Sequence, residues 1–223
     1  METIAILAAY NLEDSIASIV EKTKEYVDRV IVVSDGSNDN TYQKAKDAGA
    51  ICPNHTLTRG KGFAVRKGIN FSKQFSPKYV VLMDADGQHL PEEIPALLEP
   101  LYQKNFDMVV GSRMKGQLKT VSINKMGNFF LKLISFVVTF RWFTDTESGF
   151  KAFKAESLYG LNLESISYEI EGELLLKALH NKFRIIEVPI TVPKIVPGVT
   201  VRDGLKMGLY KLKTGLKLKI MRD

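Results

Sequence analysis

Cysteine and histidine are scarce in this chain of 223 residues. Its one cysteine, Cys52, excludes a disulfide framework and any metal site built from several cysteines. Its three histidines lie far apart, so a histidine-rich metal site is not expected. The sequence also lacks an apolar run of the ~20 residues that span a bilayer, and its N-terminus lacks the basic region of a secretory signal. We therefore expect a cytoplasmic protein with a reduced cysteine and no transmembrane anchor.

Internal repeats and low-complexity linkers are also missing. Hydrophobic residues make up 45% of the chain, which excludes wholesale disorder. Length and composition together predict one compact domain, residues 1–200, followed by a basic helix, residues 201–223. They predict no particular oligomeric state.

Positive charge is concentrated at the C-terminal end. The chain has 31 Lys and Arg against 25 Asp and Glu, for a formal net charge of +6. Residues 201–223 contain seven Lys and Arg but only two Asp, so nearly all of the excess lies in the last tenth of the chain. The excess indicates an anionic partner. The nearly neutral body argues against nucleic acid as that partner.

The first half alternates short apolar runs with helical patterns, which predicts an α/β fold with a mostly parallel sheet flanked by helices. The second half is less regular, and there we expect one further helix and one further strand. The predicted strands are Thr3–Ala9, Val30–Val33, Tyr79–Met83, Met108–Val110 and Arg184–Thr191. The predicted helices are Asp14–Tyr26, Tyr42–Ala48, Gly60–Phe71, Pro91–Tyr102 and Tyr168–Leu179.

Two carboxylates follow the third strand directly. Asp84 and Asp86 are one residue apart, and Gln88 comes two residues later. Like charges this close repel each other, and a divalent cation relieves the repulsion. Oxygen ligands suit Mg²⁺ or Mn²⁺, which commonly share their coordination with phosphate oxygens. The motif therefore favours a metal site that holds a diphosphate, with a solvated acidic turn as the alternative.

Other polar segments follow the remaining strands or open a helix. Tyr10 follows the first strand and Asp35 the second, and either residue can contact a nucleoside or belong to an ordinary turn. Lys61 lies between two glycines at a helix start, and Arg113 follows the fourth strand; both suit phosphate binding. Since parallel strands end at a common edge, these groups are expected to meet there. Together they predict a site for a nucleoside diphosphate.

The motifs in their order resemble family 2 glycosyltransferases with the GT-A fold, especially the dolichyl-phosphate mannose synthases and other polyprenyl-phosphate glycosyltransferases. The resemblance covers nearly the whole chain. The matching segments are 9–11 (Ala-Tyr-Asn), 35–37 (Asp-Gly-Ser), 60–62 (Gly-Lys-Gly), 84–89 (Asp-Ala-Asp-Gly-Gln-His), 111–113 (Gly-Ser-Arg), 145–151 (Asp-Thr-Glu-Ser-Gly-Phe-Lys), 168–171 (Tyr-Glu-Ile-Glu) and 187–190 (Glu-Val-Pro-Ile).

The resemblance implies a role for each matching residue. The metal ligands would be Asp84, Asp86 and Gln88, with Mg²⁺ or Mn²⁺ as cofactor. Asp86, Asp145 and Arg113 would be catalytic. The nucleotide-sugar site would comprise Ala8, Tyr10, Glu13, Asp35, Lys61, Asp84, Ala85, Asp86, Arg113 and Arg202.

The resemblance also implies an inverting transfer of a hexose from a nucleotide sugar to dolichyl or polyprenyl phosphate. A phosphate monoester is already a dianion near neutral pH and needs no base, whereas a saccharide hydroxyl would need one, and Asp145 is the candidate. GDP-mannose is the favoured donor on overall resemblance. UDP-glucose is the alternative, because Leu12 and Ser34 depart from the family pattern near the nucleoside and leave the base open. A non-catalytic nucleotide- or lipid-binding scaffold is the alternative of another class.

Two apolar segments point to a membrane surface as a further partner. Residues 122–140 suit a helix at an interface, or else a buried core helix. In residues 201–220, leucines gather near one helical face and lysines largely around the other, which is typical of a helix on an anionic membrane. Docking of that helix on the domain is the alternative. The favoured interpretation is a peripheral enzyme on the cytoplasmic face of a membrane.

Overall fold

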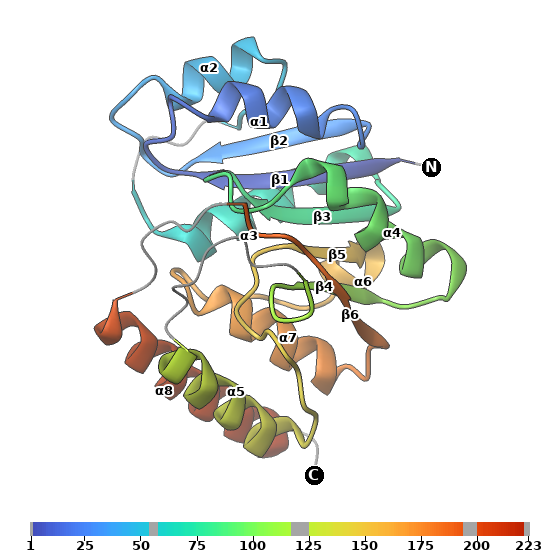
Figure 1. Cartoon of the computed structure of the whole chain (residues 1–223), viewed down its shortest axis with the longest axis vertical. Coiled ribbons are helices and arrows are strands. Elements are labelled where there is room, and N and C mark those ends of the chain that lie inside the picture. The colour runs from blue at the N-terminus through green and yellow to red at the C-terminus, as the bar shows by residue number, and fades with distance from the viewer. Residues whose placement is uncertain (1, 54–57, 117–124, 194–199, 221–223) are drawn as a thin grey trace.

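The structure is a computed structural model that describes residues 2–53, 58–116, 125–193 and 200–220, with side chains except those of residues 125–130, 139, 201 and 220. Six strands form a sheet in the order β2-β1-β3-β5-β4-β6 (Figure 1). Neighbouring pairs are parallel except those of β5, which runs antiparallel between β3 and β4. The strands are β1 (Thr3–Ala9), β2 (Arg29–Ser34), β3 (Tyr79–Asp84), β4 (Met108–Ser112), β5 (Lys151–Lys154) and β6 (Ile185–Pro189).

Helices surround this sheet, so the α/β class and the mostly parallel sheet are confirmed. The helices are α1 (Ile16–Thr23), α2 (Thr41–Asp47), α3 (Lys61–Ser72), α4 (Ile94–Gln103), α5 (Lys125–Thr139), α6 (Ala155–Tyr159), α7 (Ile170–His180) and α8 (Val201–Ile220). Two short 3₁₀ turns, Lys73–Phe75 and Pro91–Glu93, follow α3 and precede α4.

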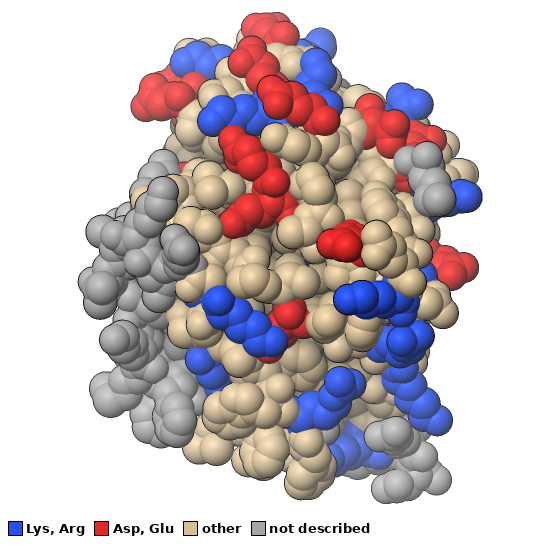
Figure 2. Space-filling model, turned by 45° about the vertical axis from the view of Figure 1, so that its right-hand side comes forward, with Lys and Arg blue, Asp and Glu red and all other residues tan. Residues whose placement is uncertain are grey.

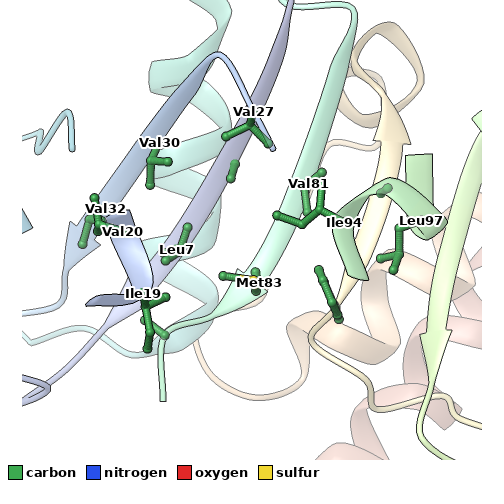
Figure 3. Close-up of a cluster of buried hydrophobic side chains, with 14 of the residues drawn as sticks. Leu7, Ile19, Val20, Val27, Val30, Val32, Val81, Met83, Ile94 and Leu97 are labelled. Carbon is green, nitrogen blue, oxygen red and sulfur yellow. The ribbon is translucent and has the colours of Figure 1, made fainter. Parts of the chain in front are cut away.

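The two faces of the sheet carry two buried clusters, because alternate residues of a strand point to opposite faces. In β1, Ala5 and Leu7 join the cluster under α1 and α4, whereas Ile4 and Ile6 join the one under α3 and α7. Figure 3 shows the first cluster, where side chains of α1 and α4 meet those of β1, β2 and β3. Its members are almost all aliphatic, and their burial fixes the register of the central strands.

Helices α5 and α8 lie side by side at the end of the molecule opposite α2 (Figure 1), and α8 also contacts α7. Gly215 lets α8 approach closely, since a Cβ there would clash with Val138 of α5. Leucines of α8 remain exposed, among them Leu205 and Leu209, which are 66% and 68% accessible. In the described part of the chain, we find no helix that combines the length and hydropathy needed to cross a bilayer.

The sequence analysis missed two adjacent elements, β5 and α6. Strand β5 has only four residues, and it begins and ends with a lysine. With so few residues and charged ends, β5 lacks the apolar run that predicts a strand inside a sheet. The predicted helix Asp14–Tyr26 is also too long, because α1 spans only Ile16–Thr23. Residues 122–124 of the apolar segment 122–140 lie outside the described residues.

Candidate functional site

The carboxyl ends of the parallel strands bring the predicted polar residues to one edge of the sheet. Ala8 pairs in register with Val33 of β2 and with Asp84 of β3. Arg113 follows β4, which runs in the same direction because both β3 and β4 are antiparallel to β5. The segments that carry Tyr10, Asp35, Asp84 and Arg113 therefore start from a common edge.

Asp35 fixes the loop that precedes Lys61. Its carboxylate accepts hydrogen bonds from the backbone N–H groups of Arg59, at 2.9 Å, and Gly60, at 2.7 Å. Gly60 has a φ of 106°, and a Cβ there would clash with the carbonyl of Ile166. Only glycine fits this turn without strain. The Asp35 carboxylate thus positions the start of α3 and, with it, Lys61.

Lys61 lies between two carboxylates. Its Nζ is 2.6 Å from Asp84 Oδ1 and 2.9 Å from Glu171 Oε1. Glu171, on α7, also pairs with the buried Lys151 of β5, which donates a second hydrogen bond to the carbonyl of Ser148. Four charges of alternating sign therefore form a chain, Asp84–Lys61–Glu171–Lys151. We call this chain the buried quartet.

Burial and charge act in opposite directions on the quartet. Burial raises the pKa of Asp84, but the charge of Lys61, supported by that of Lys151, outweighs it and lowers that pKa to about 2. Burial likewise raises the pKa of Glu171, and the charges of Lys151 and Lys61 lower it below its ordinary value. Burial lowers the pKa of Lys61, which its two carboxylates raise above the usual range. Asp84, Glu171 and Lys61 are therefore ionised at neutral pH.

The turn after β3 is held by His89. Its Nδ1 accepts a hydrogen bond from the backbone N–H of Asp84 at 3.1 Å, and its ring stacks on Phe150 with centroids 5.0 Å apart. Burial, only partly offset by the charges of Asp84 and Asp86, lowers the pKa of this imidazole. His89 thus acts here as a neutral acceptor that fixes the acidic turn.

Within that turn, Asp86 binds its own neighbour. Its two carboxylate oxygens accept hydrogen bonds from Gln88, from the backbone N–H at 2.9 Å and the side-chain Nε2 at 2.6 Å. Gly149 lies against Asp84, where a Cβ would clash with the carboxylate. The side chain of Ala85 belongs to the buried core, so any contact with a nucleotide comes from its backbone.

The donor set of this turn fits a hard divalent cation. Asp84, Asp86 and Gln88 supply carboxylate and amide oxygens, the ligands that Mg²⁺ and Mn²⁺ prefer. Within residues 2–53, 58–116, 125–193 and 200–220, no group of three or more His, Cys, Asp or Glu side chains forms a cage for a metal. That donor set suits an ion that shares its coordination with substrate oxygens and water.

Arg113 is paired with Asp145 in a two-pronged arrangement. Arg113 Nε is 2.6 Å from Asp145 Oδ2, and an Nη donates to Oδ1 at 2.8 Å. Burial raises the pKa of Asp145, but Arg113 outweighs it and holds that pKa below its ordinary value. Glu187, from β6, accepts hydrogen bonds from the backbone N–H groups of Thr144 and Asp145. Asp145 is therefore ionised and a weak base, because a low pKa disfavours proton uptake.

Three further predicted contacts lie at the margins. Tyr10 is 49% accessible. The Glu13 carboxylate accepts hydrogen bonds from the backbone and side chain of Asn40. Arg202 is exposed at the start of α8, and residues 194–199, which precede that helix, lie outside the described residues.

Sequence reasoning assigned no individual role to Lys151, Glu171 or Glu187. Each lies inside a motif that carried the resemblance, and each is a charged residue next to an apolar one. Lys151, between Phe150 and Ala152, is 1% accessible, and this burial of a charge in an apolar context is the signal that marks it. Glu171 contacts Lys61 and Glu187 holds the backbone of Asp145, whereas Lys151 acts through Glu171.

Comparison with known proteins supports one family. The family model described as "Glycosyl transferase family 2" matches residues 4–160. A UDP-N-acetylglucosamine–dolichyl-phosphate N-acetylglucosaminyltransferase of Methanococcus voltae is 32% identical over 234 residues, with 93% of each chain covered. A dolichol-phosphate mannosyltransferase of Pyrococcus furiosus is 31% identical over 211 residues, which cover 86% of this chain and 56% of that protein.

The fold also has relatives among solved structures. The glucosyl-3-phosphoglycerate synthase of Mycobacterium tuberculosis, in complex with Mn²⁺, UDP-glucose and phosphoglyceric acid, matches with a TM-score of 0.75 at 21% identity. The match covers 97% of this chain and 79% of that one. This likeness confirms the GT-A fold expected from the sequence motifs.

Proposed function

Because this chain belongs to glycosyl transferase family 2, we propose that it transfers a hexose from a nucleotide sugar to a polyprenyl phosphate, with inversion at the anomeric carbon. That it is a glycosyltransferase follows from the family. The acceptor proposal is supported by relatives named for transfer to dolichyl phosphate. The observation that carries it is the sheet edge, where Asp84 pairs with Lys61 while Arg113 is held by a buried carboxylate.

A divalent cation fits this proposal at the acidic turn. Asp84, Asp86 and Gln88 would hold it, and Mg²⁺ and Mn²⁺ are the candidates. When bound, such a cation stabilises the charge of a departing diphosphate. The structural relative crystallised with Mn²⁺ supports a divalent ion in this fold, without deciding which ion this chain uses.

The chain's own residues bind and orient the two anionic reactants. Lys61, fixed by the Asp35 loop, presents a positive charge beside Asp84 and offsets the diphosphate charge. Arg113, oriented by both oxygens of Asp145, presents a second one. Both act electrostatically, and fixed charges cost no reorganisation during the reaction. Tyr10, largely exposed at the end of β1, is available to the nucleoside.

The geometry at Asp145 favours a phosphate over a hydroxyl as the acceptor. A saccharide hydroxyl needs a base, and the candidate base is buried, paired with Arg113 and held at a low pKa. A phosphate monoester, with a second pKa of ~6, attacks as the dianion without a base. Asp145 then serves to orient Arg113, and we propose this role for it in place of proton transfer.

We further propose that α5 and α8 rest on an anionic membrane surface, where a polyprenyl phosphate resides. Exposed leucines form one stripe of α8: Leu205, Leu209, Leu212 and Leu216. Exposed lysines lie beside it, among them Lys206, Lys213 and Lys217. Figure 2 shows Lys and Arg predominating in the lower part of the molecule, whereas in the upper part they are mixed with most of the visible Asp and Glu. Apolar and basic stripes together suit an anionic bilayer.

The test is a transfer assay with radiolabelled donors. Purified protein is incubated with GDP-mannose, UDP-glucose or UDP-N-acetylglucosamine, a divalent cation and a polyprenyl phosphate. GDP-mannose is the donor we favour. Label is expected in the organic phase, and Asp84→Asn, which removes one carboxylate of the acidic turn, is expected to lower the rate at least a hundredfold.

Three other results would redirect or reject the proposal. If the label stays in the aqueous phase, attached to an added saccharide, the acceptor is a saccharide hydroxyl and not a lipid phosphate. No transfer from any donor would favour a non-catalytic binding protein. Full activity in excess chelator would show that the transfer does not require a divalent cation.

A further inference from the structure

Lys211 of α8 is a buried charge that the proposed mechanism does not use. It is 1% accessible, although most lysines of α8 are exposed. Its stem crosses α7 at Gly172, where a Cβ would lie 2.5 Å from the Lys211 Cε. The ammonium group then pairs with Glu147 and lies 3.1 Å from the hydroxyls of both Thr146 and Ser135.

A requirement for packing alone does not explain this lysine. Taking an ammonium group out of water costs several kcal/mol, and an apolar residue of similar volume is often equally good or better for stability. The route past Gly172 ends at the loop Asp145–Gly149, which we call the acceptor loop. The chain therefore carries a positive charge from its outermost helix to a particular loop.

The acceptor loop touches both halves of the site. Asp145 orients Arg113, and Gly149 lies against the Asp84 carboxylate. The start of the loop is fixed by Glu187 of β6. Its middle is bound by Lys211 of α8, through Glu147 and Thr146. One of these two anchors belongs to the sheet, and the other belongs to the helix that carries the exposed leucine stripe.

We propose that Lys211 is a positioning residue that couples the seating of α8 to the order of the acceptor loop. In this arrangement, α8 on a lipid surface holds Lys211 in place, and Lys211 holds Glu147 and Thr146. The loop then keeps Arg113 and Asp84 in their relative positions. The consequence for catalysis and the effect of a lipid surface rest on the proposed function, whereas the link from α8 to the loop through Lys211 does not.

Hydrogen exchange measured by mass spectrometry tests the coupling without any assay of activity. In Lys211→Met, amide exchange at residues 145–149 is expected to rise at least tenfold, while exchange in α1 stays at the wild-type rate. Lys211→Arg, which keeps a charge on a similar stem, is expected to restore protection. Lys213→Met removes an equal charge from the exposed side of the same helix, and we expect loop exchange in it to match wild type.

Vesicles of phosphatidylglycerol and phosphatidylcholine complete the test. They are expected to slow loop exchange in the wild type and to have little effect on the loop in Lys211→Met. If Glu147 without its cation prevents folding, the double variant Lys211→Met/Glu147→Gln removes both charges and is measured in the same way. The proposal would be overturned if loop exchange in Lys211→Met or in Lys211→Met/Glu147→Gln matched the wild-type rate. It would also be overturned if vesicles slowed loop exchange equally in the wild type and in Lys211→Met.

Kinetics separate positioning from simple stability. At saturating donor, Lys211→Met is expected to lower kcat at least tenfold, with less than a twofold change in KM for the nucleotide sugar. A lower melting temperature with unchanged kcat and KM would make Lys211 merely structural. If the wild type transfers no sugar to lipid phosphate, the proposed function fails, and the exchange experiment still decides the role of Lys211.

Discussion

At the scale of single residues, the site is organised by buried charges that are compensated one by one. Asp84, Lys61, Glu171 and Lys151 alternate in sign, so each cation lies between carboxylates or carbonyls and each anion beside a cation. Breaking such a chain leaves an uncompensated charge in a poorly solvated place. Glu171 is the critical member because it alone contacts both lysines.

Glu171→Gln tests this directly. The variant keeps the shape of the side chain but leaves Lys61 and Lys151 with one carboxylate fewer. Loss of one partner from a buried pair costs about 3–5 kcal/mol, and we expect the free energy of unfolding in urea at pH 7 to fall by that amount. Glu164→Gln is the matched control, since its side chain is 66% accessible and its pair with Lys217 spans 3.9 Å. Such an exposed pair contributes at most about 1 kcal/mol. Equal losses in both variants would contradict the account.

The sequence identifies the residues of the site better than it identifies their partners. Asp84 and Arg113 each follow a recognisable strand, and the carboxyl ends of parallel strands share an edge whatever the details of packing. That Lys61 binds Asp84 and Glu171 was not predictable, because Glu171 arrives on α7 from far along the chain. The short-range pattern contains no information on how α7 is placed against β3.

At the scale of elements, strands with apolar runs are the most predictable. Thr3–Ala9 has the predicted bounds, and it is buried on both faces, which explains the unbroken apolar run from Ile4 to Ala9. Strand β5 was missed for the opposite reason. Lys151 at its start is buried by pairing with Glu171, an interaction that exists only in the folded protein. The leucines of α8 were expected on one face, and they form its exposed stripe.

This exposed stripe predicts how α8 behaves at a membrane. Leu209→Gln with Leu216→Gln removes two side chains that are 68% and 62% accessible. Since burial of a leucine contributes about 1.5–3 kcal/mol, binding to vesicles with 30% phosphatidylglycerol is expected to weaken at least tenfold in a sedimentation assay. The urea midpoint is expected to stay unchanged, because both side chains are already in water. Equal binding to anionic and neutral vesicles would argue against the basic lysines as part of this surface.

At the scale of the whole molecule, the two ends differ in the charged and apolar side chains that they expose. The upper end in Figure 2 mixes Asp and Glu with Lys and Arg, while α5 and α8, with their exposed apolar side chains, lie at the lower end (Figure 1). The acidic turn and the acceptor loop are joined to this lower end by Lys211 and by α7, which supplies Glu171. Under the proposed function, an acceptor held at a lipid surface would enter the site from the end formed by α5 and α8.

Binding of the donor predicts a shift in the stability of the whole fold. A ligand at a hundredfold excess over its Kd stabilises the native state by about 2.7 kcal/mol. For a chain of this length, each kcal/mol raises Tm by about 2–4 °C, so the correct nucleotide sugar with Mn²⁺ or Mg²⁺ is expected to raise Tm by about 5–10 °C. The shift is expected to shrink in EDTA and in Asp86→Asn, because the diphosphate then lacks its counter-charge. Differential scanning fluorimetry against GDP-mannose, UDP-glucose and UDP-N-acetylglucosamine identifies the donor. An equal shift with and without a divalent ion would show that Lys61 and Arg113 bind the diphosphate unaided.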